Sequence, residues 1–409
     1  MALSANDRAI ARFTMMGHGL VHWFETAIPI FLVVWLAQLE VSVVLIGFVV
    51  ALGYAPFGLG ALPAGILADR FGPKRLVLVC VAGMSLGFVV IALRPSIWTI
   101  AIGLMIWGVA ASLYHPAGLS LISTGVDSRG TVFAWHGMAG NFGIALGPFA
   151  AAVLLIGFDW QFVAAALALP GIVALAYGMK ADFDPAAGVE TSINPSSNAL
   201  SWSEFLADTR VLFASTFGFV FLIVTFEGLF YRGILTYLPE ILHGLPALAT
   251  VTVGAELAGI QPSDFIYVGL LVIGMAGQFA GGKATERIDC EIGLVGIFLI
   301  LAAFALVFLP AASLGIGPLL ILCALIGFFL FAIQPFYQEA VAVHTPPEGR
   351  GLSYGYTYLG EFGLGSASVA VGGLVLGSFT VAAFFFLLSI FAVIGGSLSA
   401  ALWLWRSRR

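Results

Sequence analysis

The feature that most constrains this chain is a succession of apolar windows, each long enough to cross a lipid bilayer as a helix. A spanning helix needs roughly 20 predominantly apolar residues. Hydrophobic residues make up 61% of the 409 residues and charged residues only 9%, against about 25% charged in a soluble domain. The sequence therefore predicts an all-α membrane protein of twelve transmembrane helices. The predicted spans are 12–38, 42–67, 76–93, 97–121, 131–157, 161–179, 211–238, 264–284, 292–310, 317–341, 352–377 and 380–404.

The basic residues indicate how these spans are oriented. An even number of spans places both termini on the same side of the membrane. That side then receives fourteen of the sixteen Lys and Arg residues, and only Arg94 and Arg232 fall elsewhere. Cytoplasmic loops carry an excess of Lys and Arg. We therefore expect a multi-pass protein of the cell (inner or plasma) membrane with both termini and the 180–210 loop in the cytoplasm.

The chain also repeats itself. "GILADR" (65–70) follows the second span, and "GKATER" (282–287) follows the eighth. "FE" ends at Glu25 in the first span and at Glu227 in the seventh. Repeated halves are common in transporters. We expect two pseudo-symmetric six-helix bundles and a connecting loop, with domain limits 1–179, 180–210 and 211–409.

Polar side chains concentrate in every third span, starting from the first. Ionisable residues at membrane depth are costly and usually face a cavity or one another. We therefore expect spans 1, 4, 7 and 10, with contributions from spans 5 and 11, to line a polar interior. The predicted lining of a substrate cavity is Glu227, Arg232, His136, Asn141, Gln334, Tyr337, Gln338 and Glu361. Arg232 either pairs with an acid from another span or binds an anionic group.

The stretch "MGHGLVHWFETAIPI" (16–30) places His18, His22 and Glu25 on one face of the first span, because their spacing is i, i+4, i+7. Pro29 lacks the N–H that would bond the Glu25 carbonyl, so we expect a kink or a local opening there. A carboxyl group in a low-dielectric cavity can exchange a proton near neutral pH. We predict that Glu25 carries a coupling proton with His18, His22 and His115. The alternative is that these side chains only bond neighbouring helices.

A metal site is a further reading of the same residues. Two histidines four residues apart on a helix can chelate a metal ion, with Glu25 as a further ligand and His115 joining from the fourth span. The pair alone is a weak signal, and we assign no metal ligand and no cofactor from the sequence. Cys80, Cys290 and Cys323 show neither metal nor disulfide spacing.

"GILADRFGPKR" (65–75) closely resembles the loop between the second and third spans of major facilitator superfamily transporters. The resemblance covers the whole chain, since span count, repeat and central loop agree with it. It implies two six-helix bundles, a central cavity, alternating access and a gating function for this loop. The alternative is that the charges only anchor the topology. The matching residues are Gly65, Asp69, Arg70, Gly72, Lys74 and Arg75, echoed by Gly282, Glu286 and Arg287.

A second motif narrows the resemblance. "GIALGP" (143–148) in the fifth span is similar to the glycine–proline motif of drug–proton antiporters in that superfamily, with Gly143, Gly147 and Pro148 as the matching residues. Packing of glycines without functional meaning is the alternative. Together with "LYHPAG" (113–118), the stretch resembles the fosmidomycin-resistance type of efflux protein. Many such antiporters carry an arginine in the fourth span, which here offers Leu104 and Met105 instead.

The resemblance implies a secondary active transporter rather than an enzyme. We expect proton-coupled export of a small amphipathic molecule or drug, by a monomer in a lipid bilayer. The alternatives are a proton-coupled uptake symporter of a small metabolite, a metal-ion transporter and a membrane sensor that transports nothing. The chain has no Gly-rich phosphate loop of the kind that binds ATP, and nothing indicates a nucleic-acid partner.

The predicted topology can be tested by labelling. In a background without the three native cysteines, single cysteines at Ser197 and at Ala249 are expected to react with an impermeant thiol reagent from opposite sides of the membrane. The reason is that the two positions lie in the long loops before and after the seventh span. Labelling of both from the same side would contradict the twelve-span arrangement.

Overall fold

The computed structural model describes residues 3–188, 202–248, 262–345 and 350–408. Ser197 and Ala249, used in the labelling test, lie outside these residues. The described part is built of helices. They are α1 (Ala5–Leu39), α2 (Val43–Leu59), α3 (Ala61–Phe71), α4 (Pro73–Ala92), α5 (Ile97–Ala111), α6 (Tyr114–Gly125), α7 (Arg129–Leu155), α8 (Trp160–Leu167), α9 (Leu169–Lys180), α10 (Trp202–Phe213), α11 (Phe217–His243), the 3-10 turn η1 (Pro246–Leu248), α12 (Pro262–Ala284), α13 (Cys290–Ser313), α14 (Ile316–His344), α15 (Arg350–Tyr358), the π-helical turn η3 (Leu359–Leu364), α16 (Ala367–Ser378) and α17 (Val381–Ser407).

The predicted spans and the observed helices agree. Within the described residues, eleven helices are long and apolar enough to cross a bilayer, and a bent pair of helices makes a twelfth span. Several spans consist of consecutive helical segments, such as α8 with α9 and α15 with η3 and α16. The prediction of an all-α protein with twelve spans is therefore confirmed.

The bent span is the second, where α2 and α3 meet at 42°. Gly60 separates the two helices, and Pro63 follows within the first turn of α3. Proline cannot donate a backbone hydrogen bond to the preceding turn. Sharp kinks in helices commonly occur at proline and glycine, so these two residues account for the bend. The bend turns α3 toward α6 and α15, with which it packs.

The motif predicted to form a loop after this span is mostly helical. Residues 65–71 belong to α3, and only Gly72 leaves the helix, with a φ of 85° that favours glycine. Lys74 donates to the carbonyl oxygen of Ala181 and lies 4.9 Å from the centre of the Phe183 ring. The motif therefore ties the start of α4 to the segment after α9. The side chain of Asp69 is outside the described part of the structure.

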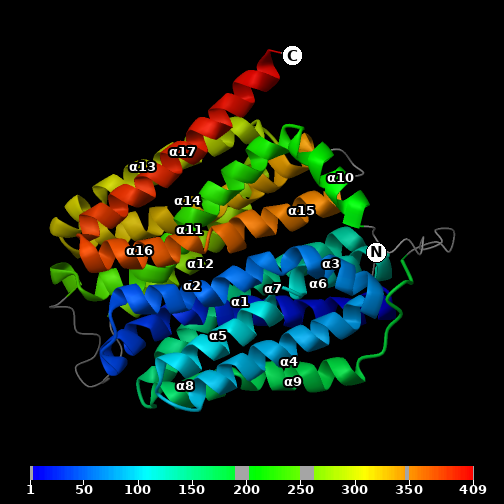
Figure 1. Ribbon diagram of the computed structural model, residues 1–409, viewed down its shortest axis with the longest axis horizontal. Coiled ribbons are helices and arrows are strands. Elements are labelled where there is room, and N and C mark those ends of the chain that lie inside the picture. Colours follow the sequence, from blue (N-terminus) through cyan, green and yellow to red (C-terminus); the bar gives the residue numbers. More distant parts are fainter. Residues whose placement is uncertain (1–2, 189–201, 249–261, 346–349, 409) are drawn as a thin grey trace.

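The helices form two groups that lie side by side, one from α1 to α9 and one from α10 to α17 (Figure 1). The first group is built around the pairs α1–α7 and α4–α5, and the second around α12–α14 and α13–α17. The predicted domain limits stay a prediction, and residues 189–201 of the 180–210 linker are outside the described residues.

The two groups touch most closely along α2, which packs against α16 and η3. Gly58 faces the backbone of Gly363 with no room for a side chain. Gly47 likewise has no room for a side chain, because it packs against the Tyr237 hydroxyl group and the backbone of Gly373. Tyr237 Oη donates to the carbonyl oxygen of Val369 over 2.5 Å. Glycines allow helices to approach in this way. The molecule is therefore closed along this line.

Close packing also explains the glycine–proline motif of α7. A Cβ atom at Gly143 would collide with the carbonyl oxygen of Gly19 in α1, and one at Gly147 would collide with that of Trp23. Pro148 leaves the Ile144 carbonyl without its helical partner. Thr26 Oγ1 of α1 lies 3.0 Å from that carbonyl oxygen and 2.7 Å from the His22 carbonyl oxygen of its own helix, so its hydroxyl group is a donor that the two helices share. The motif thus serves α1–α7 packing in this structure.

This packing predicts different effects of alanine substitution at two glycines of the same helix. Gly143→Ala is expected to lower stability by about 1–3 kcal/mol, because the added methyl group overpacks the α1–α7 contact. Gly137→Ala is the matched control, since a Cβ atom there has no neighbour within 4 Å. Alanine is favoured over glycine in a helix by about 0.8–1.0 kcal/mol, so the control should be neutral or stabilising. Thermal unfolding in detergent measures both, and equal effects would contradict the packing argument.

Candidate functional site

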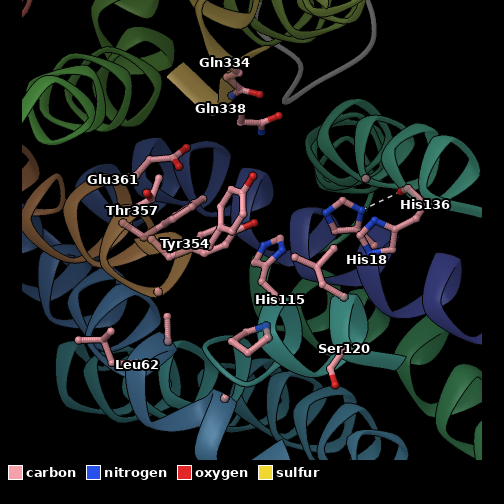
Figure 2. A pocket seen from close by; sticks show the side chains of 18 of the residues that line it. His18, Leu62, His115, Ser120, His136, Gln334, Gln338, Tyr354, Thr357 and Glu361 are labelled. Atoms are coloured by element: carbon pink, nitrogen blue, oxygen red, sulfur yellow. Dashed lines mark hydrogen bonds between the residues drawn. The ribbon is translucent and has the colours of Figure 1, made fainter. Parts of the chain in front are cut away.

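A cavity of about 920 Å³ lies between the two groups of helices. Figure 2 shows side chains from both groups around it, with His18, His115 and His136 facing Gln334, Gln338 and Glu361. Its wall reaches from these residues to α3 and α10. The predicted residues that line it are His18, His22, His115, His136, Asn141, Gln334, Tyr337, Gln338, Glu361 and Gly65. Glu227 and Arg232, which were also predicted to line a cavity, are not part of this wall.

Glu25 and Arg232 form an ion pair that joins α1 to α11. Their side chains are only 3% and 4% exposed. The second carboxylate oxygen of Glu25 lies 2.6 Å from Nδ1 of His22. Of the two roles that the sequence left open for Arg232, the structure therefore shows pairing with an acid from another span. The pair connects the N-terminal group of helices to the C-terminal group.

Pro29 contributes to the same place through the backbone of α1. Its missing N–H leaves the Glu25 carbonyl oxygen without the usual helical donor. Tyr54 Oη of α2 donates to this oxygen over 3.1 Å. The opening expected from the sequence is thus filled by a side chain, and α1 runs unbroken from Ala5 to Leu39.

Aromatic rings surround the Arg232 guanidinium. The centres of the Phe362, Tyr54 and Tyr231 rings lie 4.4, 4.7 and 5.5 Å from its Cζ atom. Cation–π contacts at such distances stabilise a cation, more strongly where water is excluded. Sequence reasoning did not single out these three residues. Tyr231 adjoins Arg232 in the chain, but nothing in the sequence indicates that Tyr54 and Phe362 meet there.

A second acidic group lies in the C-terminal half. Glu361 belongs to the π-helical turn η3 and accepts a hydrogen bond from Tyr337 Oη over 2.9 Å. Glu227 of α11 is 2% exposed, and neither of its carboxyl oxygens has a hydrogen-bond partner among the described residues. The two acids are near enough to interact electrostatically. Gly228, next to Glu227, packs directly on the Glu361 backbone.

The histidines of the N-terminal half form a compact group around the cavity. His18 Nδ1 lies 2.7 Å from the backbone carbonyl oxygen of His136, and His18 Nε2 lies 3.2 Å from His22 Nε2. The His18 and His136 rings are stacked with centres 3.9 Å apart. His115 stacks on Tyr358 of α15, with ring centres 4.7 Å apart, so it also contacts the other half.

Two further predicted residues bind partners outside the acidic group and the histidine group. Glu286 forms an exposed ion pair with Lys283, with 3.0 Å between Oε1 and Nζ. Gln334 accepts a hydrogen bond from Gln278 over 3.1 Å. A further group was missed: the buried Glu291 binds the buried His344 and the exposed Arg406 and thereby links α13, α14 and α17. Its members are too far apart in the sequence to suggest a site.

Known proteins resemble this chain along most of its length. A model of the family described as the Major Facilitator Superfamily matches residues 14–369. The multidrug resistance protein MdtH of Photorhabdus laumondii is 29% identical over 202 residues, which are 48% of this chain and 49% of that protein. The fosmidomycin resistance protein of Escherichia coli is 27% identical over 308 residues, which are 71% of this chain and 67% of that protein. The chain thus spans about half the length of the multidrug relative that it matches.

Solved structures share the fold. A bacterial homologue of the human lysosomal transporter Spinster, in an inward-facing and occupied conformation, has a TM-score of 0.75 and 15% identity, covering 98% of this chain and 97% of that one. A D-xylose–proton symporter has a TM-score of 0.71 and 15% identity, covering 98% of both chains. At this level of identity the likeness concerns the fold alone.

The ion pair gives a prediction for stability. Glu25→Gln is expected to cost about 3–5 kcal/mol, because it leaves Arg232 buried without a counter-ion. The double variant Glu25→Gln, Arg232→Gln should recover much of this loss, since no unpaired charge remains. Thermal unfolding of Glu25→Gln, Arg232→Gln and the double variant measures the coupling free energy between the two side chains. Strictly additive losses would contradict a direct pair.

Proposed function

Because the chain belongs to the Major Facilitator Superfamily, we propose that it is a proton-coupled secondary transporter that exports a small amphipathic molecule by alternating access. The resemblance predicted from "GILADRFGPKR" and "GIALGP" is confirmed by the family match and the named relatives. The protein is a many-span membrane transporter of a small molecule, and its family is not one of enzymes. Coupling, direction and substrate belong to the proposal.

Alternating access is supported by the uneven packing of the two halves. They are in backbone contact along α2, α16 and η3, whereas the cavity extends to α3 and α10. Alternating access needs two states: one in which the halves are closed at one end and the cavity is open at the other, and a second in which the closed and open ends are exchanged. With the termini in the cytoplasm, as the basic residues predict, the cavity faces the cytoplasm and receives a substrate for export.

Proton coupling is carried by one observation: Glu227 is buried next to Glu361, and its carboxyl oxygens have no hydrogen-bond partner in the part of the chain that the structure describes. An ionised carboxylate without a donor is costly to bury. Two neighbouring carboxylates also repel each other, and one proton removes this repulsion. Glu361 lines the cavity, so a proton can reach the two acids from there. We therefore assign the coupling proton to Glu227 and Glu361 together.

Glu25 differs from these acids in its surroundings. It already has a cationic partner in Arg232 and a second donor in His22. In our proposal its role is to hold the two halves together in this state. The sequence-based assignment of the coupling proton to Glu25 stays a prediction, and the same transport measurement tests both assignments.

The substrate class follows from the cavity wall, which combines aromatic rings, such as those of Phe133 and Tyr358, with amides, such as that of Gln338. Such a wall suits a molecule with an apolar body and a few polar groups. Two relatives bear the names of resistance proteins, one for multiple drugs and one for fosmidomycin. Their bacterial origin supports a location in the plasma membrane. An uptake symporter remains the alternative, since the D-xylose–proton symporter has the same fold.

Transport in proteoliposomes tests the proton assignment. Ethidium, an amphipathic cation, and fosmidomycin serve as probes under an imposed pH gradient. Glu227→Gln and Glu361→Gln are expected to abolish proton-driven accumulation while exchange of the probe without a gradient persists. Glu40→Gln is the matched control, because Glu40 is exposed at the end of α1.

The outcomes separate the assignments. Full coupling in both Glu227→Gln and Glu361→Gln, with loss only in Glu25→Gln, would overturn our assignment and support the sequence-based one. Transport of the probes without any proton movement by the unaltered protein would contradict proton coupling. Failure to transport either probe would contradict the proposed substrate class.

A further inference from the structure

His18 and His22 lie on consecutive turns of α1, and their Nε2 atoms face each other at 3.2 Å. The Nδ1 atom of each ring lies against an acceptor. For His18 this is the His136 carbonyl oxygen at 2.7 Å, and for His22 it is the Glu25 carboxylate at 2.6 Å. A carbonyl oxygen only accepts hydrogen bonds, as does an ionised carboxylate, so both Nδ1 atoms carry the hydrogen. In two neutral rings, the Nε2 lone pairs then point at each other.

Two lone pairs at this distance repel each other unless a positive charge lies between them. A third nitrogen is close by. His115 is 6% exposed, and its Nε2 has no hydrogen-bond partner among the described residues. His18, His22 and His115 each offer a ring nitrogen, and the three nitrogens lie within 4.8 Å of one another. A shared proton would hold two of these nitrogens and leave the third without a partner.

We propose that His18, His22 and His115 bind a divalent transition-metal ion of the Zn²⁺ type. Zn–N bonds of about 2.0–2.1 Å at tetrahedral angles put neighbouring nitrogens about 3.3 Å apart, close to the separation of the two Nε2 atoms. Imidazole nitrogen is a preferred ligand of such ions. This site goes beyond the transport function proposed above, and it turns the weak sequence signal of two helical histidines into a defined set of three ligands.

The surroundings of the ligands agree with a metal site. Histidines that bind metals commonly donate their second ring N–H to a carboxylate or a backbone carbonyl, which fixes the tautomer and the orientation of the ring. His22 and His18 make these two contacts. Arg232 holds the Glu25 carboxylate from the other side. The three ligands line the cavity, so a water molecule or a donor group of a bound substrate completes the coordination.

A second group of possible ligands provides a contrast. Cys290, Glu291 and His344 also bring their donor atoms within 4.8 Å of one another. Here Glu291 is already bonded to His344, over 2.6 Å, and to Arg406, over 3.1 Å. The carboxylate of Glu291 therefore has hydrogen-bond partners and a neutralising positive charge without a metal ion. The proposal therefore concerns the histidine site alone.

Zinc titration of the purified full-length protein, carrying a tag without histidine, tests the site. Calorimetry with zinc chloride is expected to show one saturable ion per chain. His22→Asn and His115→Asn should each weaken zinc binding by more than about 100-fold. Mutation of a residue that only hydrogen-bonds to a metal ligand typically weakens binding about 10–100-fold, and loss of the ligand itself should cost more. Glu25→Gln should weaken binding by about 10–100-fold. His344→Asn and the exposed His243→Asn are the controls and should bind as the unaltered protein does.

Absorption spectra with Co²⁺ in place of Zn²⁺ report the coordination geometry of the ion. We expect the bands of tetrahedral Co²⁺ in the unaltered protein and their loss when any of the three histidines is replaced. No binding by the unaltered protein would overturn the proposal. So would binding that survives in both His22→Asn and His115→Asn, or binding that is lost in His344→Asn. Size-exclusion chromatography confirms that each variant is folded. The titration involves no transport step, so its result is independent of the proposed transport function.

Discussion

The buried ion pair between Glu25 and Arg232 is the interaction on which the rest of the site depends. It joins α1 to α11 and is held on one side by His22 and on the other by the rings of Tyr54 and Phe362. Burying two charges costs solvation free energy that their attraction offsets only when the geometry is good and further partners are present. Here the aromatic rings and the histidine supply those partners. A movement of either half of the molecule therefore displaces one member of the Glu25–Arg232 pair relative to the other.

Two prolines show how the helices of the N-terminal half are tied together without breaking. Each leaves a carbonyl oxygen without its helical donor, and in each case a hydroxyl group of a neighbouring helix lies within hydrogen-bond distance of that oxygen. Tyr54 serves the carbonyl freed by Pro29, and Thr26 serves the one freed by Pro148. A polar group of the backbone cannot remain unpaired in lipid. The prolines thus convert bonds within a helix into bonds between helices.

Much of the fold could be predicted from the sequence, because span length and apolar content are local properties. The repeat and the apolar windows indicated twelve helices, and the spacing of His18 and His22 indicated that they share a face. The partner of Arg232 could not be predicted, since it comes from a span about two hundred residues away and depends on how the halves dock. The same holds for Tyr54 and Phe362. The bend between α2 and α3 was also missed, although Gly60 and Pro63 mark its place.

The composition of the ion pair has a consequence for the effect of the membrane voltage. An elementary charge that crosses the full field exchanges about 2.3 kcal/mol for every 100 mV. Glu25 and Arg232 carry opposite charges, so displacing them together moves almost no net charge and leaves the voltage little to act on. If they separate instead, each moves with its own half, and the two contributions no longer cancel. The electrical signature of a transport cycle in this protein would therefore report whether the pair stays joined while the halves rearrange.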